Sequence, residues 1–284
     1  MNRVLSVCAV LCLTVIPAAV KADITAPIVY LEHATPSVSL KINGKKVNRL
    51  AIDTGVSGGF YLPQSVFDSI FPARNHRTET QNSVDIFGVE KSAVAARAAN
   101  ITVNGERLSD VDVEIFKPWG NGMLDSNGQL IIDGVLGLGI AKNKTLIINY
   151  ASKMLTITDH LKALPDGYRW QSIPFTRTRS GIEISVLSGN EKISRMVIDT
   201  GASHTILFTR SKKGCAVLSA SCPKQTIVTP DGVRLSAFIF QVSDDKINPD
   251  KRIDFDGLLG EDFLSNRVLV ISNDRLLISS PNNS

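Results

Sequence analysis

Alternation of apolar and polar residues over short runs is the main pattern of this chain after residue 23. The runs are rich in Val, Ile and Thr, which is typical of β-strands. Pairs of residues that favour hairpins and tight turns separate them, namely Asn43-Gly44, Asn104-Gly105, Asp133-Gly134 and Asp231-Gly232. A helical period is found only in residues 63–71 and around residues 261–264. The pattern therefore predicts an all-β protein with two short helices.

Three blocks of this strand pattern occur twice, in the same order. Residues 37–63 match 181–208, residues 85–96 match 229–240, and residues 131–157 match 254–278. Repeats in a fixed order indicate an internal duplication. A chain of this length can form one large core or two moderate ones, and the duplication favours two. We therefore expect an N-terminal lobe over residues 23–160 and a C-terminal lobe over residues 161–284, with the boundary in the polar stretch 158–170.

The first block contains Asp-Thr-Gly in both copies, as Asp53-Thr54-Gly55 and as Asp199-Thr200-Gly201. A single Asp-Thr-Gly would be interpreted as a tight turn. Two copies 146 positions apart (199 − 53) in matched surroundings need another explanation. Each Asp follows an apolar strand, so it should lie on a loop held by a β core. Two related lobes that meet about a pseudo-twofold axis would bring these loops face to face.

Two carboxylates at such a junction are able to hydrolyse a peptide bond without a metal. Like charges a few ångströms apart raise one pKa strongly, so Asp53 and Asp199 would share one proton. The ionised member would take a proton from water, which then attacks the peptide carbonyl. The protonated member would hydrogen-bond the developing oxyanion and later supply a proton toward the leaving amine.

The residues beside each Asp have roles under the same hypothesis. The hydroxyls of Thr54 and Thr200 would bond across the lobe junction. Gly55 and Gly201 would let the backbone approach closely, with N–H groups toward the carboxylates. The alternative for each Thr is ordinary β-branching at the end of a strand. The same offset from Asp in both copies favours the functional interpretation.

The sequence resembles the pepsin-like aspartic proteases, in a bacterial version. The resemblance lies in AIDTGVS at 51–57, VIDTGAS at 197–203, DGVLGLG at 133–139 and LLGEDFL at 258–264. It implies a bilobal all-β fold, with two barrel-like lobes and a substrate cleft between them, and it implies Asp53 and Asp199 as the catalytic pair. By position in the family, the flap that closes over the peptide would have its tip at Ile86, Phe87 and Gly88.

Two features depart from the pepsin pattern. The flap of that family usually carries a Tyr near its tip, whereas the nearest aromatic residue here is Phe87. Val56 and Ala202 stand where the pepsin pattern has Ser or Thr, and in this the chain resembles the retroviral proteases. Without a hydroxyl donor there the ionised carboxylate is less stabilised, so we expect a working pH in the mildly acidic to near-neutral range. Ser57 or Ser203 would be the alternative donors.

Residues 1–22 have the pattern of a secretory signal, with a positive start, a short apolar run and small residues before Asp23. The run is too short to span a bilayer, so we expect an exported protein, periplasmic or secreted, without stable membrane insertion. Cys215 and Cys222 are the cysteines outside this segment, and a pair in an oxidising compartment predicts a disulfide. The short distance from Asp23 to Asp53 leaves no room for an inhibitory prosegment.

Composition bears on the remaining classes of partner. Without residues 1–22 the chain has 29 basic (31 − 2) and 27 acidic residues, a balance that gives no indication of nucleic-acid binding. The four histidines show no metal-ligand spacing, so we expect neither a metal nor another cofactor.

The sequence thus predicts a monomeric aspartic endopeptidase that acts on a peptide or protein substrate. The alternative is a non-proteolytic protein on the same fold that binds peptides or the cell envelope, because one fold can be retained when the activity is lost. A structural β-rich envelope protein would explain the repeat but not the paired Thr-Gly.

Overall fold

The computed structural model describes residues 23–32, 35–72, 78–84, 90–118, 123–159, 161, 163–189, 191–211, 213–242 and 253–281. Over these residues the chain folds into three β-sheets with two short α-helices, α1 (Gln64–Ile70) and α2 (Glu261–Leu264). The all-β class is therefore confirmed. Both helices lie where the apolar period predicted them.

The first sheet has eight strands and belongs to the first half of the chain. In spatial order they are β2 (Val29–Tyr30), β3 (Pro36–Ile42), β4 (Lys45–Asp53), β9 (Gly134–Gly137), β5 (Phe60–Leu62), β8 (Glu106–Ile115), β7 (Glu90–Val103) and β6 (Glu79–Val84). A further pairing between β3 and β7 makes the sheet curl back on itself. Helix α1 buries Val66, Phe67 and Ile70, which are the residues of its apolar face.

The second sheet has seven strands and belongs to the second half. In spatial order they are β13 (Thr176–Thr178), β14 (Gly181–Ser188), β15 (Lys192–Ile198), β19 (Gly257–Leu259), β16 (Ile206–Thr209), β18 (Arg234–Gln241) and β17 (Lys224–Val228). It also curls, because β14 pairs with β17 in addition to β13 and β15. Helix α2 follows β19 directly.

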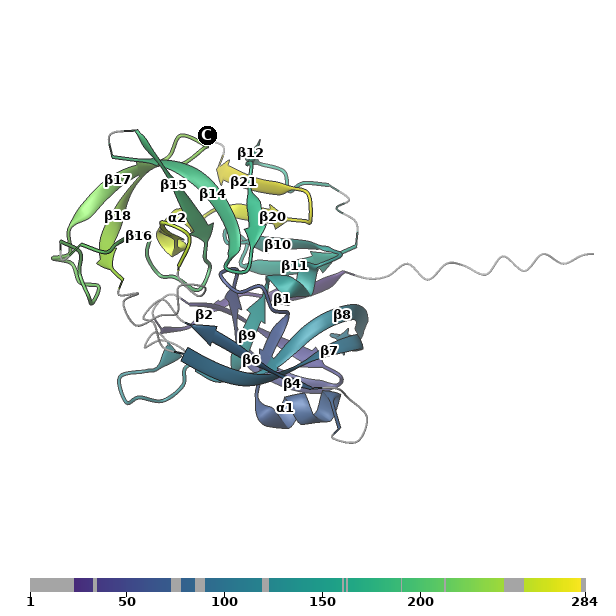
Figure 1. The fold of residues 1–284 in the computed structure, drawn as a ribbon. Coiled ribbons are helices and arrows are strands. Elements are labelled where there is room, and N and C mark those ends of the chain that lie inside the picture. Colours follow the sequence, from purple (N-terminus) through teal and green to yellow (C-terminus); the bar gives the residue numbers. More distant parts are fainter. Residues whose placement is uncertain are drawn as a thin grey trace, which may run out of the picture.

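The third sheet is antiparallel and joins the two halves. In spatial order its strands are β1 (Ile24–Pro27), β11 (Met154–Thr158), β10 (Thr145–Asn149), β20 (Val268–Ile271), β21 (Leu276–Pro281) and β12 (Tyr168–Ser172). The pairing of β10 with β20 connects the halves at its centre. Figure 1 shows the seven-stranded sheet at the upper left, the eight-stranded sheet below, and the third sheet beside both.

The two curled sheets repeat the same pairings, as an internal duplication requires. β4 runs parallel to β9 as β15 does to β19. β5 runs parallel to β8 as β16 does to β18. The third sheet contains strands from both halves, so the division into lobes 23–160 and 161–284 stays a prediction.

Strand pairing contradicts one of the three sequence matches, that of residues 85–96 with 229–240. β18 pairs with β16 as β8 pairs with β5, and β17 pairs with β14 as β7 pairs with β3. The hairpin β17–β18 is therefore the counterpart of β7–β8. The sequence contains a signal for this correspondence of hairpins, because Gly-x-Arg-Leu-Ser begins in the turn of each hairpin, at 105–109 and at 232–236.

The hairpin turns agree with the sequence except at Asp133-Gly134. In the turns Asn43-Gly44 and Asn104-Gly105 both residues have positive φ, 47° and 81° in the first and 52° and 92° in the second, which such two-residue turns require. Gly134 is instead the first residue of β9. A Cβ at this position would lie 2.4 Å from the carbonyl oxygen of Tyr61 on β5, so glycine is needed for close strand packing rather than for a turn.

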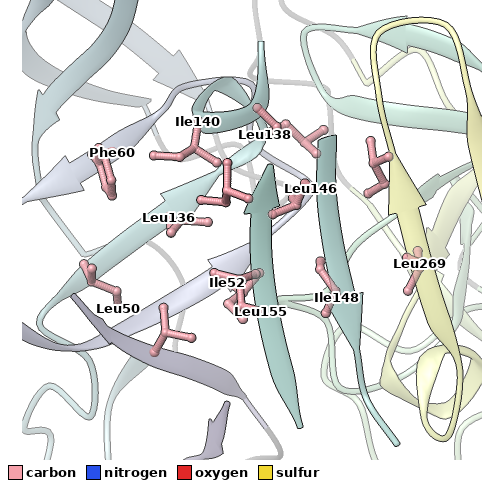
Figure 2. Close-up of a cluster of buried hydrophobic side chains, with 14 of the residues drawn as sticks. Leu50, Ile52, Phe60, Leu136, Leu138, Ile140, Leu146, Ile148, Leu155 and Leu269 are labelled. Atoms are coloured by element: carbon pink, nitrogen blue, oxygen red, sulfur yellow. The ribbon is translucent and has the colours of Figure 1, made fainter. Parts of the chain in front are cut away.

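One apolar cluster extends through all three sheets and includes the residue that precedes each Asp of the Asp-Thr-Gly loops. Ile52, Ile148 and Ile198, from β4, β10 and β15, are fully buried in it. Burying a side chain of this size stabilises the fold by about 2 kcal/mol. Figure 2 shows the part of the cluster in which β4 and β9 face β10 and β11, with Leu136 and Leu146 among the labelled residues. The residues that precede each Asp are thus anchored in the core.

Candidate active site

Asp53 and Asp199 stand at equivalent places in the two halves. Asp53 is the last residue of β4 and pairs with Gly137 of the parallel strand β9. Asp199 directly follows β15, and its backbone N–H donates to the carbonyl of Leu259 in the parallel strand β19 at 3.0 Å. Both carboxyl groups therefore begin a loop at the end of a central strand, the position expected from the sequence.

The two loops are joined by a reciprocal set of hydrogen bonds between Thr54 and Thr200. The Thr54 hydroxyl donates to the carbonyl of Ile198 at 2.6 Å, and the Thr200 hydroxyl donates to the carbonyl of Ile52 at 2.6 Å. Each hydroxyl oxygen also accepts from the backbone N–H of the other threonine at 3.1 Å. All four bonds are buried, so the threonines act as a lock between the loops rather than as ordinary strand-end residues.

Gly55 and Gly201 bring each loop against the carboxyl group of the other loop. A Cβ on Gly55 would lie 3.0 Å from Cγ of Asp199, and a Cβ on Gly201 would lie 3.1 Å from Cγ of Asp53. The backbone N–H of each glycine donates to Oδ1 of its own aspartate at 2.8 Å. Close approach is thus the reason for glycine at both positions, as the sequence predicted.

The two carboxyl groups are hydrogen-bonded to each other and have raised pKa values. Burial raises the pKa of Asp53 well above 3.8, and the charge of Asp199 raises it further. Burial also raises the pKa of Asp199, while the hydrogen bond from Asp53 and the N–H groups of Gly201 and Ala202 act in the opposite direction. Asp53 is 9% exposed and Asp199 is half-buried. The pair therefore holds one proton to a pH above the usual range for a carboxyl group.

No hydroxyl group replaces the donors that are missing at Val56 and Ala202, within the part of the chain that the structure describes. Asp53 and Asp199 each accept a hydrogen bond from the backbone N–H of the glycine two residues further on, and Asp199 also accepts from Asp53. Ser57 and Ser203 are both described, and neither hydroxyl bonds a carboxyl group of the pair.

The structure adds a residue near Asp53 that the sequence reasoning missed. The Tyr61 hydroxyl forms hydrogen bonds with the Glu114 side chain and with the backbone of Gly58. Burial raises the pKa of this hydroxyl, and the charges of Glu114 and Asp53 raise it further. By strand pairing Tyr61 of β5 corresponds to Ile206 of β16, because Tyr61 pairs with Val135 of β9 and Ile206 pairs with Leu258, the equivalent residue of β19. A hydroxyl in one copy where the other is aliphatic is the sequence signal that would have identified it.

The predicted flap tip, Ile86, Phe87 and Gly88, lies outside the described residues. The strands before and after it, β6 and β7, pair antiparallel from Glu79 and Ala95 to Val84 and Glu90. The flap assignment itself stays a prediction.

The predicted disulfide is confirmed. Cys215 and Cys222 are bridged, with their Cα atoms 5.7 Å apart. The backbone of Cys215 also forms an isolated parallel β-bridge with Phe240 of β18, so the short disulfide loop is attached to the seven-stranded sheet. Cys222 is buried.

Residues 1–22, the predicted signal segment, lie outside the described residues. Among the residues that are described, no helix is long and apolar enough to cross a membrane. Within the same residues, no group of three or more His, Cys, Asp or Glu side chains is arranged to hold a metal ion.

Comparison with known proteins gives one match, over a stretch that includes the first of the two loops. A family model of aspartyl proteases matches residues 38–140, a stretch that contains Asp53-Thr54-Gly55 but not Asp199. No curated protein matches the chain. Residues 38–140 are therefore similar to aspartyl proteases, and the structure places the second Asp-Thr-Gly segment directly against this matched stretch.

Proposed function

We propose that this protein is an aspartic endopeptidase in which Asp53 and Asp199 activate a water molecule between them. The observation that carries the proposal is the contact of each loop with the opposite carboxyl group, since Gly55 lies against Asp199 and Gly201 lies against Asp53. The aspartyl protease match to residues 38–140 supports the same chemistry for the first loop.

We assign different roles to the two members from the backbone N–H groups beside each carboxyl group. Asp199 has those of Gly201 and Ala202, whereas Asp53 has that of Gly55, so Asp199 is the ionised member and the general base. Asp53 carries the shared proton and is the general acid. Asp199 takes a proton from water as its oxygen attacks the peptide carbonyl carbon, and Asp53 gives its proton to the carbonyl oxygen.

Collapse of the tetrahedral intermediate completes the reaction. The carbon–nitrogen bond breaks, the leaving nitrogen takes the proton held by Asp199, and the former carbonyl oxygen returns its proton to Asp53. The products are a carboxylic acid and an amine, and the pair again holds one proton. No oxidant, reductant or covalent enzyme intermediate takes part.

The rest of the proposal concerns substrate and setting. The substrate is a peptide or protein segment that lies between an N-terminal lobe (23–160) and a C-terminal lobe (161–284), under a flap with its tip at residues 86–88. The protein acts as a monomer after export to the periplasm or the exterior. The Cys215–Cys222 bridge supports an oxidising compartment.

Incubation of the purified chain with a mixed peptide library tests the proposal. We expect internal cleavage that a pepstatin-type inhibitor abolishes and that EDTA leaves unchanged. Inhibition by EDTA would identify a metal-dependent reaction instead. Retention of peptides without cleavage, across pH 3 to 8, would favour the non-proteolytic peptide-binding alternative.

A further inference from the structure

Asp53 lies on the face of the eight-stranded sheet that points away from the main core. Side chains alternate along a strand, and Ile52, which precedes Asp53, belongs to the main apolar cluster. Strand pairing places four residues of the outer face in one row across the sheet, namely Ala51 of β4, Val135 of β9, Tyr61 of β5 and Glu114 of β8. Glu114 therefore lies on the same face of the sheet as the Asp53 carboxyl group.

The second sheet has the equivalent row without a carboxylate. By the same pairings this row consists of Val197 of β15, Leu258 of β19, Ile206 of β16 and Phe238 of β18. Glu114 thus corresponds to Phe238. Placing a charge on a half-buried surface costs free energy, and the other half of the molecule fills this position with an aromatic ring. The fold therefore does not require a carboxylate at Glu114.

Tyr61 connects Glu114 to the loop that carries Asp53. The Tyr61 hydroxyl donates to the Glu114 side chain and accepts from the backbone N–H of Gly58. A Cβ at Gly58 would lie 2.6 Å from Oη of Tyr61, so the ring is packed directly against this loop. The charge of Asp53 also reaches Tyr61. Glu114 is therefore one side chain away from the candidate active site.

The Glu114 carboxylate forms no ion pair within the part of the chain that the structure describes. The arginine on the neighbouring strand, Arg97, is paired with Asp112. The lysine nearest along the chain, Lys117, donates to the backbone carbonyl of Ser92 instead. A carboxylate accepts several hydrogen bonds, so its negative charge is still able to bind a cation.

Apolar side chains on the same face suit the stem of a long basic residue. The N–H of Phe116 donates to the carbonyl of Leu62 and so continues the pairing of β8 with β5, which places Phe116 on the face of Glu114. Phe116, Val56 and Met123 all pack against the small apolar cluster of this face and stay partly exposed. Val56 directly follows the first Asp-Thr-Gly segment. Lys and Arg side chains lay their aliphatic stems on such a surface and keep the charged head at a polar group.

The equivalent surface around Phe238 has the opposite charge. Nζ of Lys224 lies 4.2 Å from the centroid of the Phe238 ring, and the centroid of the His204 ring lies 5.3 Å from it. His204 belongs to the second loop and stands five residues after its aspartate, as Gly58 does in the first loop. This surface disfavours a second cation, so the two halves of the molecule offer different chemistry to a substrate.

We propose that Glu114 is a specificity-determining residue, which binds a Lys or Arg side chain of the peptide substrate beside Asp53. The stem of the basic side chain lies on Val56 and Phe116, and its charged head binds the Glu114 carboxylate. The surface around Phe238 has no such carboxylate, so the preference applies on one side of the scissile bond. The effect on cleavage rests on the proposed function, whereas the effect on peptide binding is measured without cleavage.

The first readout compares cleavage of two peptides at pH 7. A mixed library identifies the position at which wild type prefers Lys or Arg, and two peptides with Lys or norleucine at that position are then compared. The ratio of their kcat/KM values does not depend on how much of a variant is folded. A hydrogen bond between charged groups is equivalent to about tenfold, so we expect a Lys-to-norleucine ratio of about ten in wild type.

Two variants of Glu114 and one control test whether this carboxylate sets the ratio. Glu114→Gln keeps the size of the side chain and removes its charge, so the ratio should fall to about one. Glu114→Lys reverses the charge, so the ratio should fall below one. Glu106→Gln, at the other end of β8, should keep the wild-type ratio. A library without preference for Lys or Arg, or a ratio that Glu114→Gln leaves unchanged, would overturn the inference.

The second readout is retention of the library peptides by immobilised protein, which does not depend on cleavage. The proteins compared are Asp199→Asn and the double variant Asp199→Asn, Glu114→Gln. We expect peptides that contain Lys or Arg to be enriched about tenfold on the first and not on the second. If wild type cleaves no peptide, the proposed function fails and this comparison alone decides the inference. Equal retention by the two proteins, or retention by neither, would contradict it.

Discussion

Thr54 and Thr200, 146 residues apart, exchange the same pair of hydrogen bonds with each other and each bind the strand that leads to the other. The lock is symmetrical, because the internal duplication places both threonines at the same offset from an aspartate. It fixes the distance between two loops that share no strand, and so it fixes the distance between Asp53 and Asp199.

Removal of one hydroxyl from this lock should cost stability and activity together. Thr200→Val leaves the Ile52 carbonyl and the Thr54 N–H buried without their partners, so we expect the free energy of unfolding to fall by about 2 to 4 kcal/mol. Denaturant titration of the purified variant measures this change. Thr200→Ser keeps the hydroxyl and is the matched control. Equal stability of the Val and Ser variants would show that the lock contributes nothing.

Gly55→Ala should reduce kcat, because the added methyl group displaces a catalytic carboxyl group. The added Cβ would lie 3.0 Å from both Cγ and Oδ2 of Asp199, so the carboxyl group must move by a few tenths of an ångström. Misplacement of a catalytic group is costly, and we expect kcat to fall roughly 10- to 100-fold with a smaller change in KM. Gly189→Ala is the control, because its Cβ meets only the Gln225 side chain. Equal kcat in the two variants would contradict the close packing of the pair.

The Cys215–Cys222 bridge should contribute stability without taking part in catalysis. It closes a short loop, for which chain entropy gives about 2.5 kcal/mol. The double variant Cys215→Ala, Cys222→Ala should lose about this amount in denaturant titration and keep its kcat. Thiol titration of unfolded wild type should find no free thiol at these positions. Two reactive thiols in exported material would refute the bridge.

Much of this fold was predictable because local pattern and strand pairing agree. Alternation predicts the strands, and repetition of Asp-Thr-Gly predicts the meeting of the two loops, which follows from pseudo-symmetry rather than from any single residue. The counterpart of the second repeated block was not predicted correctly. A single Gly in a turn says little about which hairpins correspond, whereas the longer Gly-x-Arg-Leu-Ser repeat at 105–109 and 232–236 indicates β7–β8 and β17–β18.

The surroundings of the candidate site were less predictable than its centre. The Tyr61 hydroxyl meets Glu114 and Gly58 because β5 packs beside β8, a contact that the local sequence around Tyr61 does not indicate. The role of Gly134 also could not be predicted from its local sequence. Its requirement comes from the Tyr61 carbonyl on another strand, so local turn propensity gave the wrong interpretation.

Hydroxyl donors introduced beside the pair should move the pH profile downward. Val56→Ser with Ala202→Thr supplies a donor to each carboxylate, which favours the ionised form and lowers both pKa values of the pair. Activity needs the singly protonated pair, so both limbs of the kcat/KM profile should shift to lower pH. Wild type should work in the mildly acidic to near-neutral range, because burial raises the pKa of Asp53 and of Asp199. A wild-type optimum near pH 2, with no activity by pH 5, would contradict this reasoning.

The central claim is that Asp53 and Asp199 act as one pair, and Asp199 is its sharper test because the aspartyl protease match ends before it. The measurement is kcat/KM for peptide cleavage by Asp199→Asn beside wild type, with circular dichroism and thermal melting to show that the variant is folded. Members of such a pair are not independent, so we predict loss of cleavage by at least about 1,000-fold in a folded protein. Near wild-type cleavage by folded Asp199→Asn would contradict the account.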